Sequence, residues 1–189
     1  IIDWFLQKRK KIILKLNTHL LTNSKKMLNI ISNFYRIERN KISVQPYLLK
    51  KSKIKCKNFN SREFSICIVG RLALSKGHEN LLYAFSDCVK IHPKLKLIIV
   101  GDGPEKAKLK KLANPNIHFH GNDTNSNVEN LMSTCRAFIY AGIEDFGIAP
   151  IEAIASGAPI IALAKGGLLD TVNCLNKYSK NKICTGILF

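Results

Sequence analysis

Two glutamates that could act together lie eight residues apart in the stretch EDFGIAPIE, residues 144–152. On one continuous helix Glu144 and Glu152 would be about 12 Å apart along the axis and roughly 80° apart around it, too far to share a small ligand. Gly147 instead allows a turn whose backbone N–H groups face an anion, and Pro150 suits the first turn of a new helix. Both carboxylates could then accept hydrogen bonds from hydroxyl groups in one pocket. The alternative is that Glu152 only complements the helix dipole in the first turn and Glu144 is an exposed loop charge.

Two cations, Arg71 and Lys76, form a second candidate group in the segment GRLALSKG, residues 70–77. They lie between an apolar run and a predicted helix, and a helix N-terminus with nearby cations favours a phosphate group. The spacing is not that of a Walker loop. The alternative is two surface cations in a very basic chain. The later stretch GDGP, residues 101–104, lacks the third glycine of a dinucleotide fingerprint and predicts a tight turn.

The elements that would position these residues alternate from residue 65 onward. Apolar strands are predicted over residues 65–70, 95–100, 116–120, 137–141 and 159–163. Helices are predicted over residues 78–91, 104–112, 125–135 and 150–156 and from residue 168. The first of these helices has an apolar face of Leu81, Leu82, Ala84, Phe85 and Val89. The alternation predicts an α/β fold, a Rossmann-like parallel sheet with helices on both faces.

Glycines mark one edge of this predicted sheet. Ligands of parallel sheets bind beyond the carboxyl ends of the strands. Four of the five predicted strands end at a glycine, and the fifth leads into a double glycine, namely Gly70, Gly101, Gly121, Gly142 and Gly166-Gly167. We therefore expect close backbone approach along this edge.

The first 62 residues follow a different pattern. Helices are predicted over residues 4–16 and 25–35 around a short segment at 19–22, and residues 50–60 are polar and basic. We therefore divide the chain into a first part over 1–49, a basic interdomain linker over 50–62 and a second domain over 63–189. The chain starts without a methionine and ends on the apolar run GILF, so we expect it to be part of a larger protein.

The net charge of +17, from 30 basic and 13 acidic residues, favours anionic partners such as phosphates, acidic lipid surfaces or nucleic acid. The alternative is a coding bias, because Lys, Asn and Ile are abundant together and much of the lysine could be solvated surface. A nucleic-acid partner is not expected, because the chain lacks aromatic residues interleaved with the charge and any recognisable nucleic-acid-binding module.

The cysteines and histidines indicate neither a disulfide framework nor a metal site. The six cysteines contain no C-x-x-C pair, and several lie in apolar runs, as buried thiols do. We expect a reducing compartment, cytoplasmic or organelle-stromal. His118 and His120 share a face of one strand, but the five histidines show no other ligand spacing. No apolar stretch reaches the roughly 20 residues that a membrane span needs.

Several motifs in order resemble the C-terminal, donor-binding half of the retaining family-4 glycosyltransferases, the group 1 glycosyl transferases with the GT-B fold. They are VGRL…KG at 69–77, IIVGDGPE at 98–105, NIHFHG at 116–121, AGIEDFGIAPIEAIASGAPIIA at 141–162, GGLLDTV at 166–172 and TGILF at 185–189. Each is weak alone, but together they keep the family's order and spacing over about two-thirds of the chain. Residues 1–49 resemble, less firmly, the closing part of the family's N-terminal acceptor domain.

The resemblance implies transfer of a sugar, with retention of configuration, from a GDP- or UDP-sugar to a glycan or lipid-linked acceptor, with no required metal or other cofactor. Arg71 and Lys76 would neutralise the diphosphate. Glu144, the first acid of the family's E-x7-E pattern, would face the donor sugar, without a role as nucleophile, and Glu152 would bind the ribose. The other implied donor-binding residues are Gly70, Gly103, Gly121, Phe146, Gly147 and Ile148.

The chain also departs from the family pattern. The family often has Pro-Ser before the first acid, where this chain has Tyr140-Ala141-Gly142-Ile143. After the double glycine it commonly has Glu, where this chain has Asp170. The segment AGIEDFGIAP resembles more closely the sequences of a mannosyltransferase subset that builds surface polysaccharides. This resemblance favours GDP-mannose as the donor. The Gly-rich loop and histidine of the family's first domain are not in the sequence, so we expect weak donor binding without turnover. Alternatives are a truncated or degenerate nucleotide-sugar-binding module without catalysis or, less favoured, a basic nucleic-acid-binding protein; peripheral contact with an anionic membrane is compatible with the enzyme.

Overall fold

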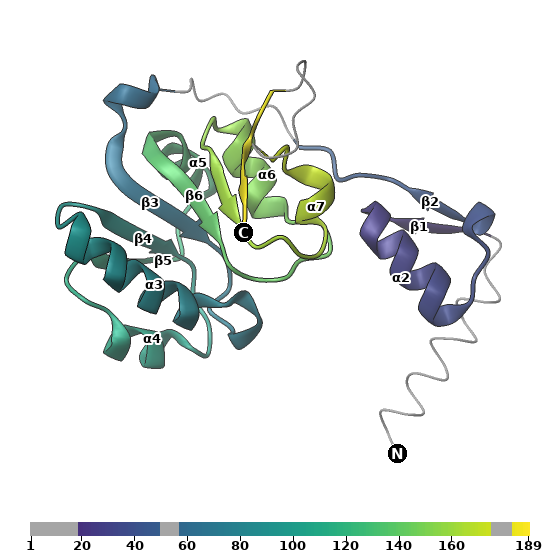
Figure 1. The fold of residues 1–189 in the computed structure, drawn as a ribbon, viewed down its shortest axis with the longest axis horizontal. Coiled ribbons are helices and arrows are strands. Elements are labelled where there is room, and N and C mark those ends of the chain that lie inside the picture. The colour runs from purple at the N-terminus through teal and green to yellow at the C-terminus, as the bar shows by residue number, and fades with distance from the viewer. Residues whose placement is uncertain (1–18, 50–56, 175–182) are drawn as a thin grey trace. The chain divides into compact units, whose positions relative to one another are not determined.

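The computed structural model of the chain describes residues 19–49, 57–174 and 183–189 (Figure 1). The chain divides into two compact units, residues 1–48 and 49–189. The helix predicted over residues 4–16 lies outside the described residues, as do residues 50–56 of the predicted linker. The domain boundaries drawn from the sequence stay a prediction.

The first unit contains two short strands and one helix, β1 (Leu20–Thr22), α2 (Lys25–Tyr35) and β2 (Ile42–Val44). β1 and β2 pair in parallel. Helix α2 has the predicted bounds because both of its ends are capped. The Ser24 hydroxyl accepts a hydrogen bond from the Met27 N–H at 3.2 Å, and Arg36 ends the helix in the left-handed conformation. Strand β2 was not predicted, since three residues carry too little periodicity.

The second unit is built on a six-stranded parallel sheet with the strand order β5-β4-β3-β6-β7-β8 (Figure 1). The predicted parallel sheet is therefore confirmed. Its strands are β3 (Glu63–Val69), β4 (Lys96–Val100), β5 (Ile117–Gly121), β6 (Cys135–Tyr140), β7 (Ile160–Ala162) and β8 (Gly186–Leu188). Its helices are α3 (His78–Ile91), α4 (Lys106–Leu112), α5 (Asn125–Thr134), α6 (Ile148–Ala155) and α7 (Leu168–Thr171).

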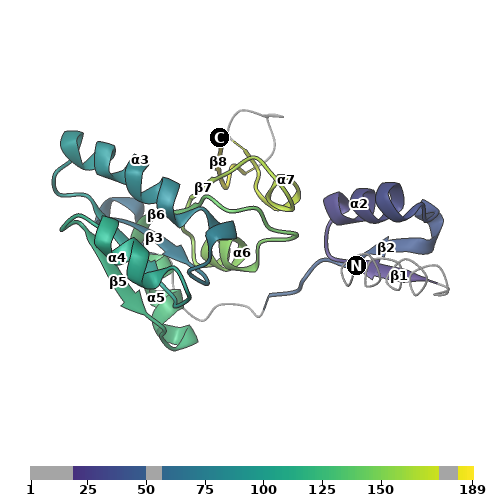
Figure 2. The same ribbon diagram turned by 90° about the horizontal axis from the view of Figure 1, so that it is seen from below.

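Helices cover both faces of this sheet, and each face has its own core (Figure 2). Neighbouring residues of β3 point to opposite faces, and both Cys67 and Ile68 are fully buried. On one face the strands pack with α3 and α4 through Leu82 and Leu109. On the other face they pack with α5, α6 and α7 through a cluster that includes Met132, Phe138, Ala153 and Leu168.

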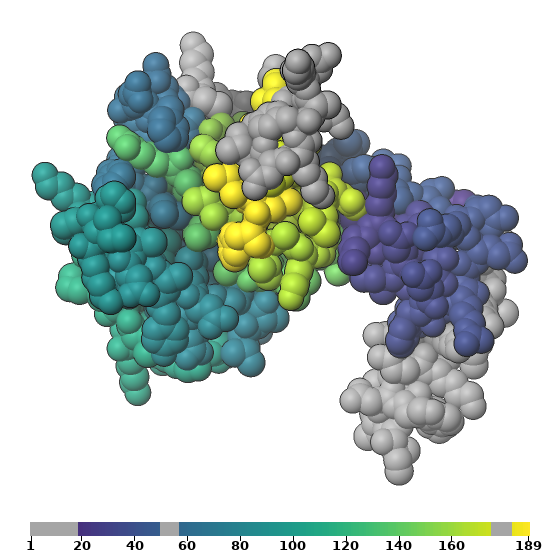
Figure 3. Space-filling model, in the orientation of Figure 1, coloured from purple at the N-terminus to yellow at the C-terminus, as the bar shows by residue number. Residues whose placement is uncertain are grey.

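The last strand, β8, was also missed, because only three apolar residues signal it. It pairs in parallel with β7 at the edge of the sheet, with Ile160 opposite Gly186. A Cβ at Gly186 would lie 2.3 Å from the Ile160 carbonyl oxygen, so the strand approaches too closely for any other residue. Ile187 of this strand and Phe189 after it are exposed, and the C-terminal residues form part of the surface (Figure 3).

Other differences from the sequence predictions are local. Ala84 was predicted on the apolar face of α3 but is exposed. Helix α4 begins at Lys106 rather than at residue 104, because Pro104 and Glu105 form a turn in which the Lys106 N–H donates to the Gly103 carbonyl at 3.1 Å. Helix α6 begins at Ile148, two residues before the predicted start at Pro150.

At the amino ends of the central strands, Arg62 is buried and donates a hydrogen bond to the Cys135 carbonyl at 3.3 Å. Beside it, the Arg136 guanidinium lies 5.1 Å from the Phe64 ring centroid and 5.8 Å from that of Phe59. Residue 62, the end of the predicted linker, thus packs against the sheet. Within the described ranges, no helix has the length and apolar character needed to cross a membrane.

Candidate functional site

Hydrogen bonds join the loops that follow the central strands. Gly70 donates to the Val100 carbonyl at 3.0 Å, and Leu72 donates to the Asp102 carbonyl at 2.9 Å. Gly101 in turn donates to the Gly121 carbonyl at 2.8 Å. The loops after β3, β4 and β5 therefore form one connected surface at the carboxyl edge of the sheet, where ligands of parallel sheets bind.

The loop after β3 also touches the loop after β6. A Cβ added at Gly142 would lie 2.9 Å from the Lys76 Cα, so the two backbones meet at a position that only glycine allows. In contrast, a Cβ at Gly70 or Gly121 would have no atom within 4 Å. The expected close approach therefore holds at Gly142 and fails at these two glycines, beside which there is open space.

This contact brings Lys76 and Glu144 together. The Lys76 Nζ forms an ion pair and hydrogen bond with Glu144 Oε1, and the two side chains are only 23% and 28% exposed. Lys76 was predicted to face a diphosphate and Glu144 a sugar, so the structure joins two residues from separate predicted motifs.

Tyr140, the last residue of β6, completes the group and was missed from the sequence. Its hydroxyl donates a hydrogen bond to the same atom, Glu144 Oε1. Burial first, and then the hydrogen bond and negative charge of Glu144, raise the pKa of the Tyr140 phenol far above its usual range. The sequence did show that this segment departs from the family's Pro-Ser. That departure alone does not indicate which role the tyrosine has.

The double glycine after β7 holds the backbone of Glu144. The Gly167 N–H donates to the Glu144 carbonyl at 2.6 Å. Gly166 has a positive φ of 69°, and a Cβ there would lie 2.2 Å from the same carbonyl oxygen. Glu144 is thus fixed by its backbone on one side and by its carboxylate on the other.

The loop after Glu144 leads into α6 through two buried residues, Phe146 and Gly147, of which Gly147 has a φ of 86° and caps the helix. Ile148 is exposed at the first position of the helix. Because α6 starts at Ile148, Glu152 lies beyond its first turn, which contains no acidic residue. The alternative interpretation of Glu152 as a first-turn dipole partner is therefore wrong.

Glu152 has a different environment from Glu144. Burial raises the pKa of the Glu152 carboxyl above its ordinary value, and the negative charge of Glu129 on α5 raises this pKa further. No described residue donates a hydrogen bond to the Glu152 carboxylate in the way that Tyr140 and Lys76 do to that of Glu144. That the two glutamates serve one ligand stays a prediction.

The other predicted site residues lie along the same edge without joining the Lys76–Glu144 pair. Arg71 is exposed on the loop after β3 and forms no ion pair with a described residue. Gly103 follows β4, and a Cβ there would lie 2.4 Å from the Leu72 carbonyl oxygen. Across the described ranges, no group of three or more His, Cys, Asp or Glu side chains could hold a metal ion.

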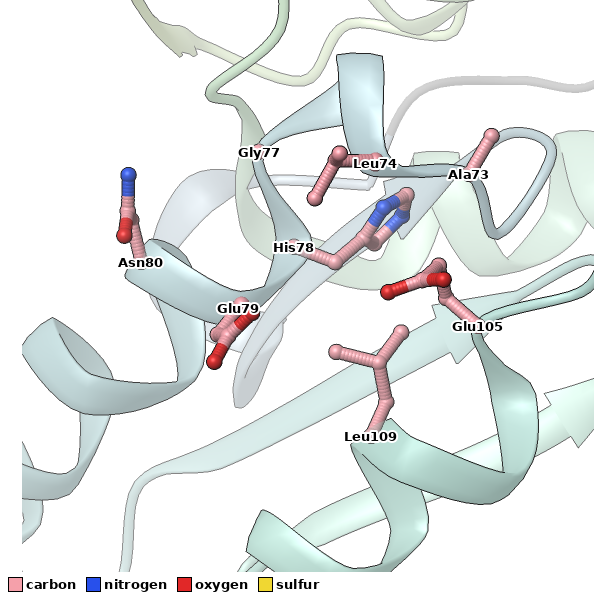
Figure 4. Close-up of a pocket in the computed structure, with 8 residues that line it drawn as sticks. All are labelled: Ala73, Leu74, Gly77, His78, Glu79, Asn80, Glu105 and Leu109. Carbon is pink, nitrogen blue, oxygen red and sulfur yellow. The ribbon is translucent and has the colours of Figure 1, made fainter.

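A small pocket lies between the first turn of α3, the loop before it and the start of α4 (Figure 4). The His78 ring points into it and is only 3% exposed, yet neither ring nitrogen has a well-formed hydrogen bond with a described residue. Burial and the charge of Lys76 lower the pKa of His78, against a smaller effect of the Ala73 backbone. The imidazole is therefore neutral beside the chain segment that carries Lys76.

Comparisons with known proteins identify the family of this chain. The family model described as "Glycosyl transferases group 1" matches residues 50–185. A GDP-mannose-dependent monoacylated α-(1-6)-phosphatidylinositol monomannoside mannosyltransferase of Corynebacterium glutamicum is 30% identical over 113 residues, which cover 54% of this chain and 30% of the relative. An α-monoglucosyldiacylglycerol synthase of Acholeplasma laidlawii is 34% identical over 105 residues, which cover 52% of this chain and 26% of the relative.

Solved structures agree on the fold. TarM superposes with a TM-score of 0.79 at 20% identity, covering 97% of this chain and 35% of TarM. The pneumococcal O-GlcNAc transferase GtfA, solved with UDP and GlcNAc, superposes with a TM-score of 0.71 at 21% identity, covering 93% of this chain and 37% of GtfA. The chain thus spans about a third of the length of the relatives that it matches.

Proposed function

Because the chain belongs to the glycosyl transferases group 1 family, we propose that it carries the donor-binding site of a retaining glycosyltransferase. The donor is a nucleoside-diphosphate sugar, and the acceptor is a glycan or a lipid-linked group. The observation that carries the proposal is the Lys76–Glu144 pair at the carboxyl edge of the sheet. A cation suits a diphosphate and a carboxylate suits sugar hydroxyls, so one cluster offers partners for both parts of such a donor.

The diphosphate binds over the loop after β3. Lys76 and the exposed Arg71 supply the positive charge, and the open space beside Gly70 and Gly121 admits the ligand close to the backbone. The backbone of Phe146, Gly147 and Ile148 adds N–H groups at the start of α6. When the sugar is transferred, the leaving nucleoside diphosphate gains negative charge, which these fixed cations and dipoles stabilise.

The two glutamates bind the two sugars of the donor. Glu144 accepts hydrogen bonds from the hydroxyls of the transferred sugar, and Glu152 accepts them from the ribose. Neither acts as a nucleophile in this proposal, and no metal ion is required. Lys76 turns from Glu144 to the diphosphate when the donor binds, because the more highly charged diphosphate attracts its ammonium group more strongly than a single carboxylate does.

GDP-mannose is the proposed donor. The segment AGIEDFGIAP and the mannosyltransferase relative that is named for GDP-mannose support this choice. Other relatives and neighbours are named for UDP-N-acetylglucosamine or were solved with UDP, so UDP-sugars are the competing donors. Two relatives have names that include a lipid, a phosphatidylinositol monomannoside and a monoglucosyldiacylglycerol. This supports a lipid-linked acceptor, and the net charge of +17 supports peripheral contact with an anionic membrane.

Calorimetry tests the proposal directly. The 189-residue chain is titrated with GDP, UDP and ADP, and then with GDP-mannose, UDP-glucose and UDP-N-acetylglucosamine. We expect GDP and GDP-mannose to bind best, and Glu152→Ala to weaken binding of every nucleotide by removing the ribose contact. Glu38→Ala, an exposed glutamate of the first unit, is the matched control and should change nothing. Absence of binding by all six compounds at millimolar concentration would refute the proposed function.

A further inference from the structure

The Tyr140 side chain is held in a fixed position beside the Glu144 carboxylate. It is the last residue of β6, its side chain is nearly fully buried, and only 3% of the residue is exposed. Its carbonyl accepts a hydrogen bond from the Leu163 N–H at 3.0 Å, and it pairs with Ala162 of β7. The backbone and ring of Tyr140 are therefore held by the sheet before any ligand binds.

Both partners of the Glu144 carboxylate contact the same oxygen. Lys76 Nζ and the Tyr140 hydroxyl each donate to Oε1, while Oε2 accepts no hydrogen bond from a described residue. The carboxylate thus has one anchored oxygen and one oxygen available to a ligand. This asymmetry is a geometric feature of the site and does not depend on which ligand binds.

The two partners differ in how firmly they hold Oε1. Lysine is a compact charge on a flexible stem with four carbons, whereas the buried tyrosine ring has two side-chain torsions and a fixed strand beneath it. A diphosphate attracts the ammonium group of Lys76 but not the hydroxyl of Tyr140. After that exchange, Tyr140 is the partner that keeps Oε1 in place.

We propose that Tyr140 is a positioning residue that orients the Glu144 carboxylate, so that Oε2 meets the hydroxyls of the donor's transferred sugar while Lys76 serves the diphosphate. This inference rests on the proposed function, and it assigns to Tyr140 a role in recognising the sugar rather than the nucleotide. Burial and the neighbouring carboxylate keep the phenol protonated across the neutral range, so it donates throughout.

The test compares each nucleoside diphosphate with its sugar nucleotide. Tyr140→Phe removes the hydroxyl and keeps the ring in its buried site. We expect the affinity for the nucleoside diphosphate to stay within about twofold of wild type, and the affinity for the matching sugar nucleotide to fall about five- to tenfold. Tyr83→Phe, at a tyrosine on α3 that is 55% exposed, is the matched control and should change neither.

A double-mutant cycle separates positioning from a merely structural effect. If Tyr140 acts through Glu144, adding Tyr140→Phe to Glu144→Ala weakens sugar-nucleotide binding no further. A general loss of packing would instead lower both affinities alike and add to the effect of Glu144→Ala. If Tyr140→Phe loses affinity equally for nucleotide and sugar nucleotide, or loses none, the inference about Tyr140 is overturned and the proposed function stands. If the wild-type chain binds none of the compounds, the proposed function fails and the inference falls with it.

Discussion

Lys76 and Glu144 are 68 residues apart in the chain, yet they form an ion pair on one oxygen of the carboxylate. Each comes from a loop that follows one of the two neighbouring strands at the centre of the sheet, β3 and β6. The pair means that Lys76 is already engaged before a ligand arrives. A phosphate must therefore compete with Glu144 for Lys76, and the strength of that competition can be measured.

Replacing Lys76 by methionine should lower the affinity for a nucleoside diphosphate about tenfold, since one charge-assisted contact is lost. The dependence of this affinity on salt should also become shallower. The stability of the fold should change by less than ~1 kcal/mol, because the pair is partly exposed to solvent. Calorimetry at two ionic strengths measures the first two effects. Lys90→Met is the control at an exposed lysine paired with Asp87, and equal affinities of the two variants would contradict the role of Lys76.

Gly166→Ala should destabilise the protein by ~2 kcal/mol or more. The added methyl group would meet the Glu144 carbonyl oxygen at 2.2 Å, at a backbone position with a φ of 69°. Gly70→Ala is the matched control, because a Cβ there meets no atom within 4 Å, and it should leave the free energy of unfolding within ~1 kcal/mol. Urea denaturation followed by circular dichroism gives both values. Equal stabilities for the two variants would show that Gly166 does not constrain the Glu144 backbone.

The carboxyl of Glu152 should make stability depend on pH. Its pKa is raised on folding by burial and by Glu129, so the native state holds the proton more tightly than the unfolded state does. Its stabilising contribution is full below the unfolded pKa of about 4.3 and is lost as the pH rises through the native pKa. Glu152→Gln should therefore have a higher Tm than wild type at pH 7, and the difference should shrink as the pH falls towards 4.3.

The matching variant Glu129→Gln removes the like charge near Glu152 and should raise the Tm at pH 7 by a smaller amount than Glu152→Gln. Thermal melts of the three proteins from pH 4 to pH 8 measure the effect. A Tm difference between wild type and Glu152→Gln that stays constant over this range would count against a raised pKa.

Alkylation of the native protein should distinguish the cysteines by burial. Cys88 is exposed on α3, whereas Cys67 and Cys135 are fully buried in adjacent strands. The interaction with the Cys135 thiol, and then burial, also raise the pKa of the Cys67 thiol, which lowers its reactivity. Brief treatment with iodoacetamide, followed by peptide mass spectrometry, should label Cys88 and leave the other two until urea is added. Early labelling of Cys67 would mean that the sheet opens at β3.

Local patterns were enough to predict most of the elements. Helices α2 and α3 have the predicted bounds, since their residues repeat with helical periodicity and their ends carry clear signals, such as Ser24 before α2. Strands β2 and β8 were missed because a three-residue strand depends on its partner strand more than on its own sequence. The start of α6 was displaced because Gly147, rather than Pro150, ends the preceding loop.

The pairing of side chains could not be predicted in the same way. The sequence indicated that Lys76 and Glu144 lie at one edge, but their contact depends on the backbone approach at Gly142. The role of Tyr140 depends on the direction in which the end of β6 points its ring. Such facts arise from the order of strands in the sheet, which brings distant segments side by side.

The hydrogen bonds that join Leu72 to Asp102 and Glu105 have a consequence for protein engineering. Both bonds join backbone groups, so they depend on the path and length of the two segments and not on their side chains. A segment of the same length from a relative can therefore replace either one and keep these bonds. An insertion or deletion in one segment should instead disturb the other as well.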